Sequence, residues 1–189
     1  GAHVGRWAVL AGFGVAVAGG IALGKRALPR ISTALLVSAS PVLAAVLFGL
    51  ASERFLDLSW DGRAYHQEAV IQLREGWNPL REHDLPRPAP MGSYAANYPK
   101  GPYLVAAAVF DLTHRIESAK LAGLFLLVCA YAATLAALRL TALARGPAAH
   151  LIAALAAANP VALCQTASFM VDGQLASLLT CGIACGAVV

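Results

Sequence analysis

The stretch AKLAGLFLLVCAYAATLAAL, residues 119–138, decides the class of fold. Its one charge lies near the start, on Lys120, and its length matches the roughly 20 apolar residues that a helix needs to cross a bilayer. Four more apolar runs are predicted spans, at 7–24, 31–51, 150–170 and 175–189. The run 150–170 is interrupted at Asn159-Pro160, where we expect a kink. The predicted fold class is therefore all-α: a polytopic transmembrane helical bundle that forms a single domain over residues 1–189.

The composition supports a membrane protein. Of 189 residues 59% are apolar and 13% are charged, with a net charge of +4, whereas a soluble domain has about 25% charged residues. These values argue against a soluble domain, a disordered chain and a nucleic-acid-binding protein with a dense basic face. Because the chain starts at Gly1 instead of Met and stops at Val189 within an apolar run, we expect a fragment of a longer protein.

The positions of Lys and Arg predict the orientation of the spans, because cytoplasmic connections are enriched in both. Two connections are basic and are predicted to be cytoplasmic; their cations are Lys25, Arg26 and Arg30 in the first, and Arg139 and Arg145 in the second. The segment between them, 52–118, is predicted to be a long outer loop. Its apolar part, 101–114, is too short for the roughly 30 Å hydrocarbon core, so we expect a juxtamembrane or partly inserted helix there.

Aromatic residues concentrate in this outer loop. Four of the five tyrosines and two of the three tryptophans lie between residues 60 and 103, and such rings favour the membrane–water interface. Tyr65, Ala69 and Leu73 recur every four residues, with Val70 beside them. This spacing predicts an amphipathic helix that lies on the bilayer surface.

A few polar residues at the ends of spans are candidates for chemistry. Asp61 follows the second span in SWDGRAYH, and Asp172 with Gln174 ends another in FMVDGQLAS. His66 and Lys100 belong to the same outer face. A carboxylate at a span end is often functional. Two of them from separate elements can frame a pocket in which one accepts the proton of an acceptor hydroxyl while a cation holds a phosphate.

Each candidate also has a structural interpretation. Asp61 can cap the amphipathic helix, and Lys100 can extend its ammonium group toward lipid headgroups. Asp172 and Gly173 can mark a break between two helices. The remaining polar residues with a structural interpretation are His66, as an interfacial residue, and Glu117 with Lys120, as a helix-surface ion pair.

Four segments carry a family resemblance: WDGRAYH (60–66), ANYPKGPYL (96–104), ESAKL (117–121) and ANPVALCQTASFMVDGQLAS (158–177). In their order and spacing, the chain from about residue 31 to 189 resembles the N-terminal part of the GT-C superfamily of membrane glycosyltransferases. That superfamily includes protein O-mannosyltransferases, lipid A aminoarabinose transferases and oligosaccharyltransferases.

The resemblance implies inverting transfer of a sugar from a polyprenyl-phosphate carrier in the membrane lipid to an acceptor on the non-cytoplasmic face. It makes Asp61 the expected base or metal contact, with Asp172 as the second acid. An Mg²⁺ or Mn²⁺ ion between these two carboxylates is an option, not a requirement. Lys100 matches a cation for the lipid phosphate. The other residues that we expect to contact substrate are Tyr65, His66, Tyr98 and Gln174.

Two other functions remain open. A transporter would carry ionisable groups near the middle of its spans, and none of the clear spans has one at its centre. A non-catalytic membrane scaffold is the other. The alanine-rich composition and the lack of targeting features favour a bacterial inner membrane, with the site on the periplasmic side and no nucleic-acid partner.

Overall fold

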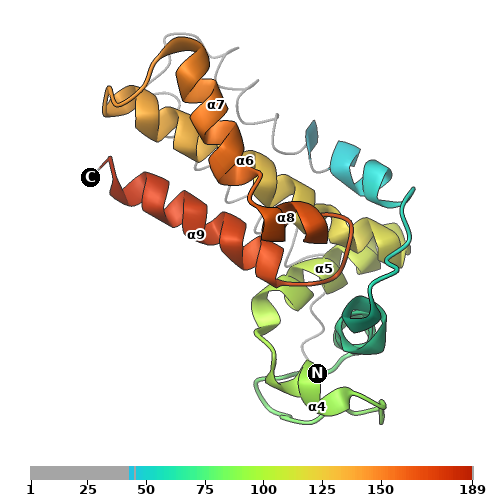
Figure 1. Ribbon diagram of the computed structural model, residues 1–189. Coiled ribbons are helices and arrows are strands. Elements are labelled where there is room, and N and C mark those ends of the chain that lie inside the picture. Colours follow the sequence, from blue (N-terminus) through green and yellow to red (C-terminus); the bar gives the residue numbers. More distant parts are fainter. Residues whose placement is uncertain (1–42, 45, 189) are drawn as a thin grey trace, which may run out of the picture.

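The computed structural model describes residues 43–44 and 46–188. Within them the protein is helical and contains no strand (Figure 1). The elements in chain order are η1 (Gly62–His66), α3 (Gln67–Arg74), α4 (Gly92–Asn97), α5 (Lys100–Thr113), η2 (Ile116–Lys120), α6 (Leu121–Leu140), α7 (Gly146–Ala157), α8 (Pro160–Gln165) and α9 (Asp172–Gly186). The predicted span 7–24 and most of the span 31–51 lie outside the described residues.

Helix α6 forms the axis of the fold. Together with η2 it is a 25-residue helical stretch, Ile116–Leu140, and it is the one helix in the described part of the chain that is long and apolar enough to cross a membrane. This confirms a helix at the predicted span 119–138. Helices α7 and α9 pack along α6 (Figure 1). Phe169 and Val171, just before α9, share a core with α5, so Asp172 lies at the end of α6 that is opposite to the α6–α7 connection (Figure 1).

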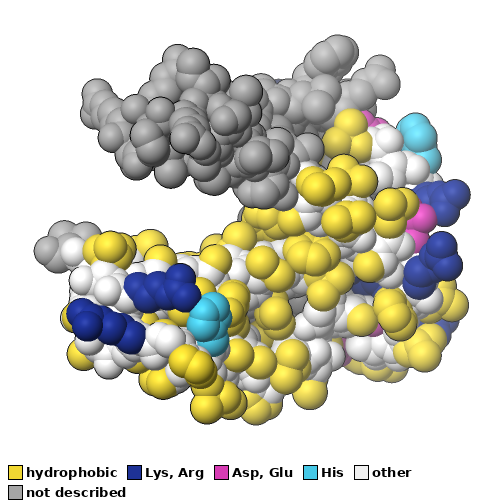
Figure 2. All heavy atoms as spheres, turned by 90° about the horizontal axis from the view of Figure 1, so that it is seen from above, with side chains coloured by type: hydrophobic (Ala, Val, Ile, Leu, Met, Phe, Trp, Pro, Cys, Tyr) yellow, Lys and Arg dark blue, Asp and Glu magenta, His cyan; other side chains and the backbone are white. Residues whose placement is uncertain are grey.

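The bundle has small residues inside and large apolar residues outside. Ala130, Ala137 and Ala153 are buried, which lets helix backbones approach closely, as in membrane bundles. The large apolar side chains of α7 and α9 that point outward are Leu151, Ile152, Leu155, Leu175, Leu178, Leu179 and Ile183. Figure 2 shows a broad hydrophobic band between two ends at which Lys and Arg side chains gather.

The predicted span 150–170 is not one continuous helix. Helix α7 ends at Ala157, and the side chain of Asn159 accepts a hydrogen bond from Ala162 N (3.0 Å) to start a separate short helix, α8. Pro160 has no amide hydrogen to continue the α7 ladder. Twelve residues of α7 span about 18 Å, which is shorter than a hydrocarbon core. The interruption at Asn159-Pro160 therefore separates two helices, where a kink within one span was expected.

The amphipathic helix forms, but its apolar face is buried within the protein and not in the bilayer surface. Tyr65, Ala69, Val70 and Leu73 are each at most 4% exposed, so the predicted face is confirmed. The surface that covers this face comes from α5 and neighbouring loops, and the other buried members of this core are Trp77, Ala95, Tyr103, Ala106, Ala107, Ala119, Phe169 and Val171. The alanines of α5 explain the difference, because they offer a close, flat surface on which the helix packs.

Segment 101–114 forms a helix, as expected, with bounds Lys100–Thr113.

Candidate functional site

The segment that leads into η1 is a tight turn built on Asp57. One carboxylate oxygen, Oδ1, accepts hydrogen bonds from Ser59 N (2.9 Å) and Ser59 Oγ (2.6 Å), and Ser59 Oγ accepts one from Gly62 N (3.1 Å). The side chain of Asp61, next to this turn, makes no capping hydrogen bond. Capping therefore does not explain Asp61, because Ser59 satisfies the start of the helix instead.

Asp57 also joins the two segments that carry the candidate carboxylates. Its second oxygen, Oδ2, accepts a buried hydrogen bond of 2.6 Å from Phe169 N, which lies 112 residues later in the loop before α9. Asp57 is 3% exposed. Asp57 is not among the site residues predicted from the sequence. The spacing Asp57-x-Ser59 is a signal for the local turn, but no local pattern indicates a bond to Phe169.

Gly62 has no space for a side chain. A Cβ atom at this position would lie 2.1 Å from Asp57 Oδ2 and 2.3 Å from Ser59 Oγ. We expect Gly62→Ala to destabilise the protein by about 1–3 kcal/mol through overpacking, with a lower melting temperature of the purified protein in detergent. Gly101→Ala is the matched control, because a Cβ at Gly101 meets nothing within 4 Å. Equal melting temperatures for the two variants would contradict the tight turn.

His66 lies at the centre of the candidate site. It is 1% exposed, and its Nδ1 and the hydroxyl of Tyr103 on α5 are joined by a 2.6 Å hydrogen bond. The interpretation of His66 as an interfacial residue is wrong, because α5 covers it. Burial lowers the pKa of His66, against the opposing negative charges of Asp61, Asp172 and Asp57.

Three carboxylates act on the charge of this one imidazole. Asp57 and Asp61 belong to the segment before η1, and Asp172 belongs to the first turn of α9. Because burial keeps the pKa below its ordinary value, the ring is neutral at physiological pH and carries one donor and one acceptor nitrogen. The structure thus places Asp61 and Asp172 where the charge of each acts on His66.

Tyrosine rings pack against His66. The hydroxyls of Tyr65 and Tyr98 lie 3.4 Å apart, and the Tyr98 ring meets the His66 ring edge-on at 5.0 Å between centroids. Burial raises the pKa of Tyr65, and the bond to Tyr98 and the charge of Asp61 add to the shift. Burial likewise raises the pKa of Tyr103. These phenols therefore keep their protons and remain hydrogen-bond donors.

Lys100 is held by backbone carbonyls at the edge of this cluster. Its ammonium group donates to Ala96 O (2.6 Å) and Tyr98 O (2.5 Å), and it lies 5.5 Å from the ring centroid of Trp77. Burial lowers the pKa of Lys100. An ammonium group has three donors, so these two bonds leave one donor. The residue closes the end of α4 and does not extend toward headgroups as a free side chain.

Asp172 is exposed at the start of α9, where a negative charge favours the helix N-terminus. Its Oδ2 accepts a 3.2 Å hydrogen bond from Gln165 Nε2, while Gln165 Oε1 accepts one from Gly173 N (2.6 Å). A break between helices does occur before Asp172, as its structural interpretation predicted. Gln174 is buried in α9.

The Glu117–Lys120 pair forms at 2.6 Å, but Lys120 is 1% exposed and not on a helix surface. Lys120 also donates to the carbonyl of Phe55, and Glu117 accepts a 3.3 Å hydrogen bond from Asp57 N. The prediction of a surface pair is therefore wrong. The 3₁₀ turn of η2 faces the segment before η1, and this buried pair ties that segment to the start of α6.

A divalent ion has two oxygen ligands here at most. Within the described residues no group of three or more His, Cys, Asp and Glu side chains could hold a metal. Both oxygens of Asp57 already accept hydrogen bonds, so Asp61 and Asp172 would hold an ion. Mg²⁺ is commonly bound by one or two carboxylates with waters and substrate phosphates, and the donor set fits that mode. When bound, such an ion would neutralise charge on a phosphate.

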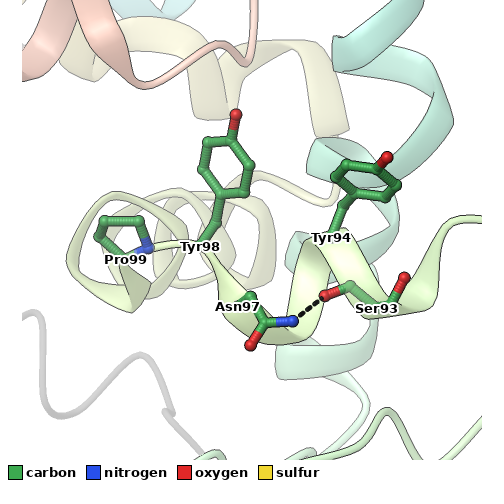
Figure 3. A pocket seen from close by; sticks show the side chains of 5 residues that line it. All are labelled: Ser93, Tyr94, Asn97, Tyr98 and Pro99. Atoms are coloured by element: carbon green, nitrogen blue, oxygen red, sulfur yellow. Dashed lines mark hydrogen bonds between the residues drawn. The ribbon is translucent and has the colours of Figure 1, made fainter.

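A hollow of about 550 Å³ opens next to these tyrosines, lined by Ser93, Tyr94, Asn97, Tyr98 and Pro99 (Figure 3). Taken together, the site offers carboxylates, phenols, a neutral imidazole and an ammonium group, and it shares Tyr98 with the hollow. Such a set can accept a proton from a hydroxyl and bind an anion. Comparison of the chain with protein-family models, curated proteins and solved structures finds no match.

Proposed function

We propose that the chain is part of a multi-pass membrane glycosyltransferase that moves a sugar from a polyprenyl-phosphate carrier to an acceptor on the non-cytoplasmic face. The observation that carries this proposal is the buried hydrogen bond from Phe169 N to Asp57 Oδ2, which ties the segment before Asp61 to the loop before Asp172; the charges of both Asp61 and Asp172 act on His66. Two segments more than 100 residues apart are thus held together. The resemblance of the four sequence segments to GT-C enzymes gives this constellation its reaction class.

In the proposed reaction Asp61 takes the proton of the acceptor hydroxyl as that oxygen attacks the anomeric carbon. The new carbon–oxygen bond forms on the face opposite to the phosphate, the bond from the anomeric carbon to the phosphate oxygen breaks, and polyprenyl phosphate leaves with the electron pair. The configuration inverts. A positioned base of this kind contributes about 10²–10⁴-fold to a rate.

Neighbouring groups have supporting roles. The third donor of Lys100 binds the departing phosphate, and this charge-assisted bond is stronger in the transition state than before it. The hydroxyls of Tyr65 and Tyr98 orient the substrate. Asp172 holds the second side of the pocket, alone or with a divalent ion, and Gln174 packs behind it.

The apolar surface supports a membrane location. Outward-facing Leu and Ile side chains on α7 and α9, and the hydrophobic band of Figure 2, suit contact with lipid. In this proposal the α6–α7 connection, with Arg139 and Arg145, faces the cytoplasm, and the site at the other end of α6 faces the periplasm of a bacterial cell.

The test is a transfer assay in membranes. Bacterial membranes that contain the protein are mixed with radiolabelled undecaprenyl-phosphate glucose or mannose, and release of undecaprenyl phosphate is measured against membranes without the protein. We expect faster release with at least one donor. Uptake of labelled sugar into vesicles without cleavage of the phosphate bond would instead favour a transporter.

A labelling experiment tests the topology. With the native cysteines replaced, cysteines introduced at positions 61 and 172 are expected to react with a membrane-impermeant maleimide from the periplasmic side. A cysteine at position 145 is the control and should react only after permeabilisation. Labelling of positions 61 and 172 from opposite sides would contradict the proposed function.

A further inference from the structure

The hollow beside α4 has a lining with a distinct chemistry. Figure 3 shows the rings of Tyr94 and Tyr98 projecting from the same side of the segment, with Pro99 next to Tyr98. Tyr94 is 54% exposed, although its ring stacks on Tyr65 at 5.4 Å between centroids. The hollow therefore presents the faces and edges of aromatic rings to whatever enters it.

Neutral polar groups stand beside these rings. Asn97 Nδ2 donates to Ser93 O (2.8 Å), which fixes the amide and leaves its Oδ1 as an acceptor. Within the described part of the chain, the hydroxyls of Ser93 and Tyr94 have no hydrogen-bond partner. None of the five lining side chains is charged. A phosphate or a charged peptide would find no complementary charge among them.

A ligand that matches this lining has apolar C–H faces for the rings and hydroxyls for the neutral polar groups. A sugar ring has both. A cavity of about 550 Å³ lies within the usual range of about 300–1,000 Å³ for small-molecule sites. A lipid chain would leave the polar groups without partners.

We propose that the hollow lined by Ser93, Tyr94, Asn97, Tyr98 and Pro99 is a binding subsite for a neutral sugar ring. The place of this subsite in the reaction rests on the proposed function. Tyr98 lines the hollow, and its hydroxyl accepts a hydrogen bond from the hydroxyl of Tyr65. The charge of Asp61 contributes to the raised pKa of Tyr65. The bound ring belongs either to the acceptor or to the lipid-linked donor, since both present the same chemistry.

The experiment is saturation-transfer NMR on the full chain in lipid nanodiscs, with the methyl glycosides of glucose, galactose, mannose and N-acetylglucosamine as probes. We expect transfer to at least one glycoside. Tyr94→Ala should weaken its binding about fivefold, whereas Tyr94→Phe, which keeps the ring, should weaken it less. Leu80→Ala is the control, because Leu80 lies in the same loop and is 95% exposed.

Competition separates the two sources of the ring. If undecaprenyl-phosphate sugar displaces the glycoside, the hollow takes the donor sugar; if both bind together, it takes the acceptor. Absence of transfer to all four glycosides, or equal binding by wild type and Tyr94→Ala, would overturn the proposal. Asp61→Asn should retain glycoside binding, so a failure of the catalytic proposal is distinguishable from a failure of this one.

Discussion

Replacement of Asp61 by asparagine is expected to lower the rate of sugar transfer by about 10²–10⁴-fold. The amide has almost the shape of the carboxylate but cannot accept the proton of the acceptor hydroxyl. In the structure the Asp61 side chain makes no capping bond, so the substitution removes no bond that starts the helix. The assay compares kcat and KM of the two proteins, and the proposal predicts that the loss lies in kcat.

The matched control is Asp84→Asn. Asp84 is exposed in the same outer loop, and the substitution changes the charge of the loop by the same amount. This variant should retain its activity. Full activity in Asp61→Asn would show that Asp61 is not the base and would favour a non-catalytic role or a scaffold.

Asp57→Ala is expected to have the largest effect on stability. The substitution leaves the buried Phe169 amide, the Ser59 amide and the Ser59 hydroxyl without their acceptor. A bond to a charged acceptor contributes about 1.5–3 kcal/mol, so we expect a loss of about 3 kcal/mol or more. In a chain of 189 residues that loss lowers the melting temperature by about 6–12 °C.

Asp57→Asn separates the loss of a hydrogen-bond acceptor from the loss of side-chain volume. All three partners of Asp57 are donors, so one of them would face the amide NH₂ group instead of an oxygen. We therefore expect Asp57→Asn to be destabilised as well, although less than Asp57→Ala. Thermal unfolding in detergent measures both, with Asp84→Asn as the control for loss of one exposed charge. A melting temperature of Asp57→Ala equal to that of the control would contradict the joint role of Asp57.

Local patterns predicted the helical elements well. An uninterrupted apolar run predicted α6, and the four-residue spacing of Tyr65, Ala69 and Leu73 predicted the buried face of η1 and α3. The covering of that face was not predictable, because an amphipathic pattern shows which side is apolar and not what packs on it. The break at Asn159-Pro160 was visible as an interruption, but its consequence, two separate helices, required the capping bond of Asn159.

Parts of the candidate site were also predictable from local sequence patterns. Asp61 and Asp172 stand at the ends of apolar runs, where a charge is conspicuous. Asp57 and Lys120 were missed or misassigned, because their partners Phe169 and Phe55 are backbone groups far along the chain. A backbone amide or carbonyl has no residue-type signature, so spacing alone cannot indicate such bonds. Lys100 was predicted as a cation of the site. Its hydrogen bonds to the carbonyls of Ala96 and Tyr98 were not predictable, because they depend on the path of the chain.

The most direct test of the central claim, that Asp61 and Asp172 meet at one site, is the pKa of His66 measured by NMR titration of the labelled imidazole. Both carboxylates raise this pKa against the effect of burial. Removal of either charge should therefore lower it further, in Asp61→Asn and in Asp172→Asn alike, while Asp84→Asn leaves it unchanged. A His66 pKa that responds to only one of the two substitutions, or to neither, would mean that the two carboxylates do not share a site.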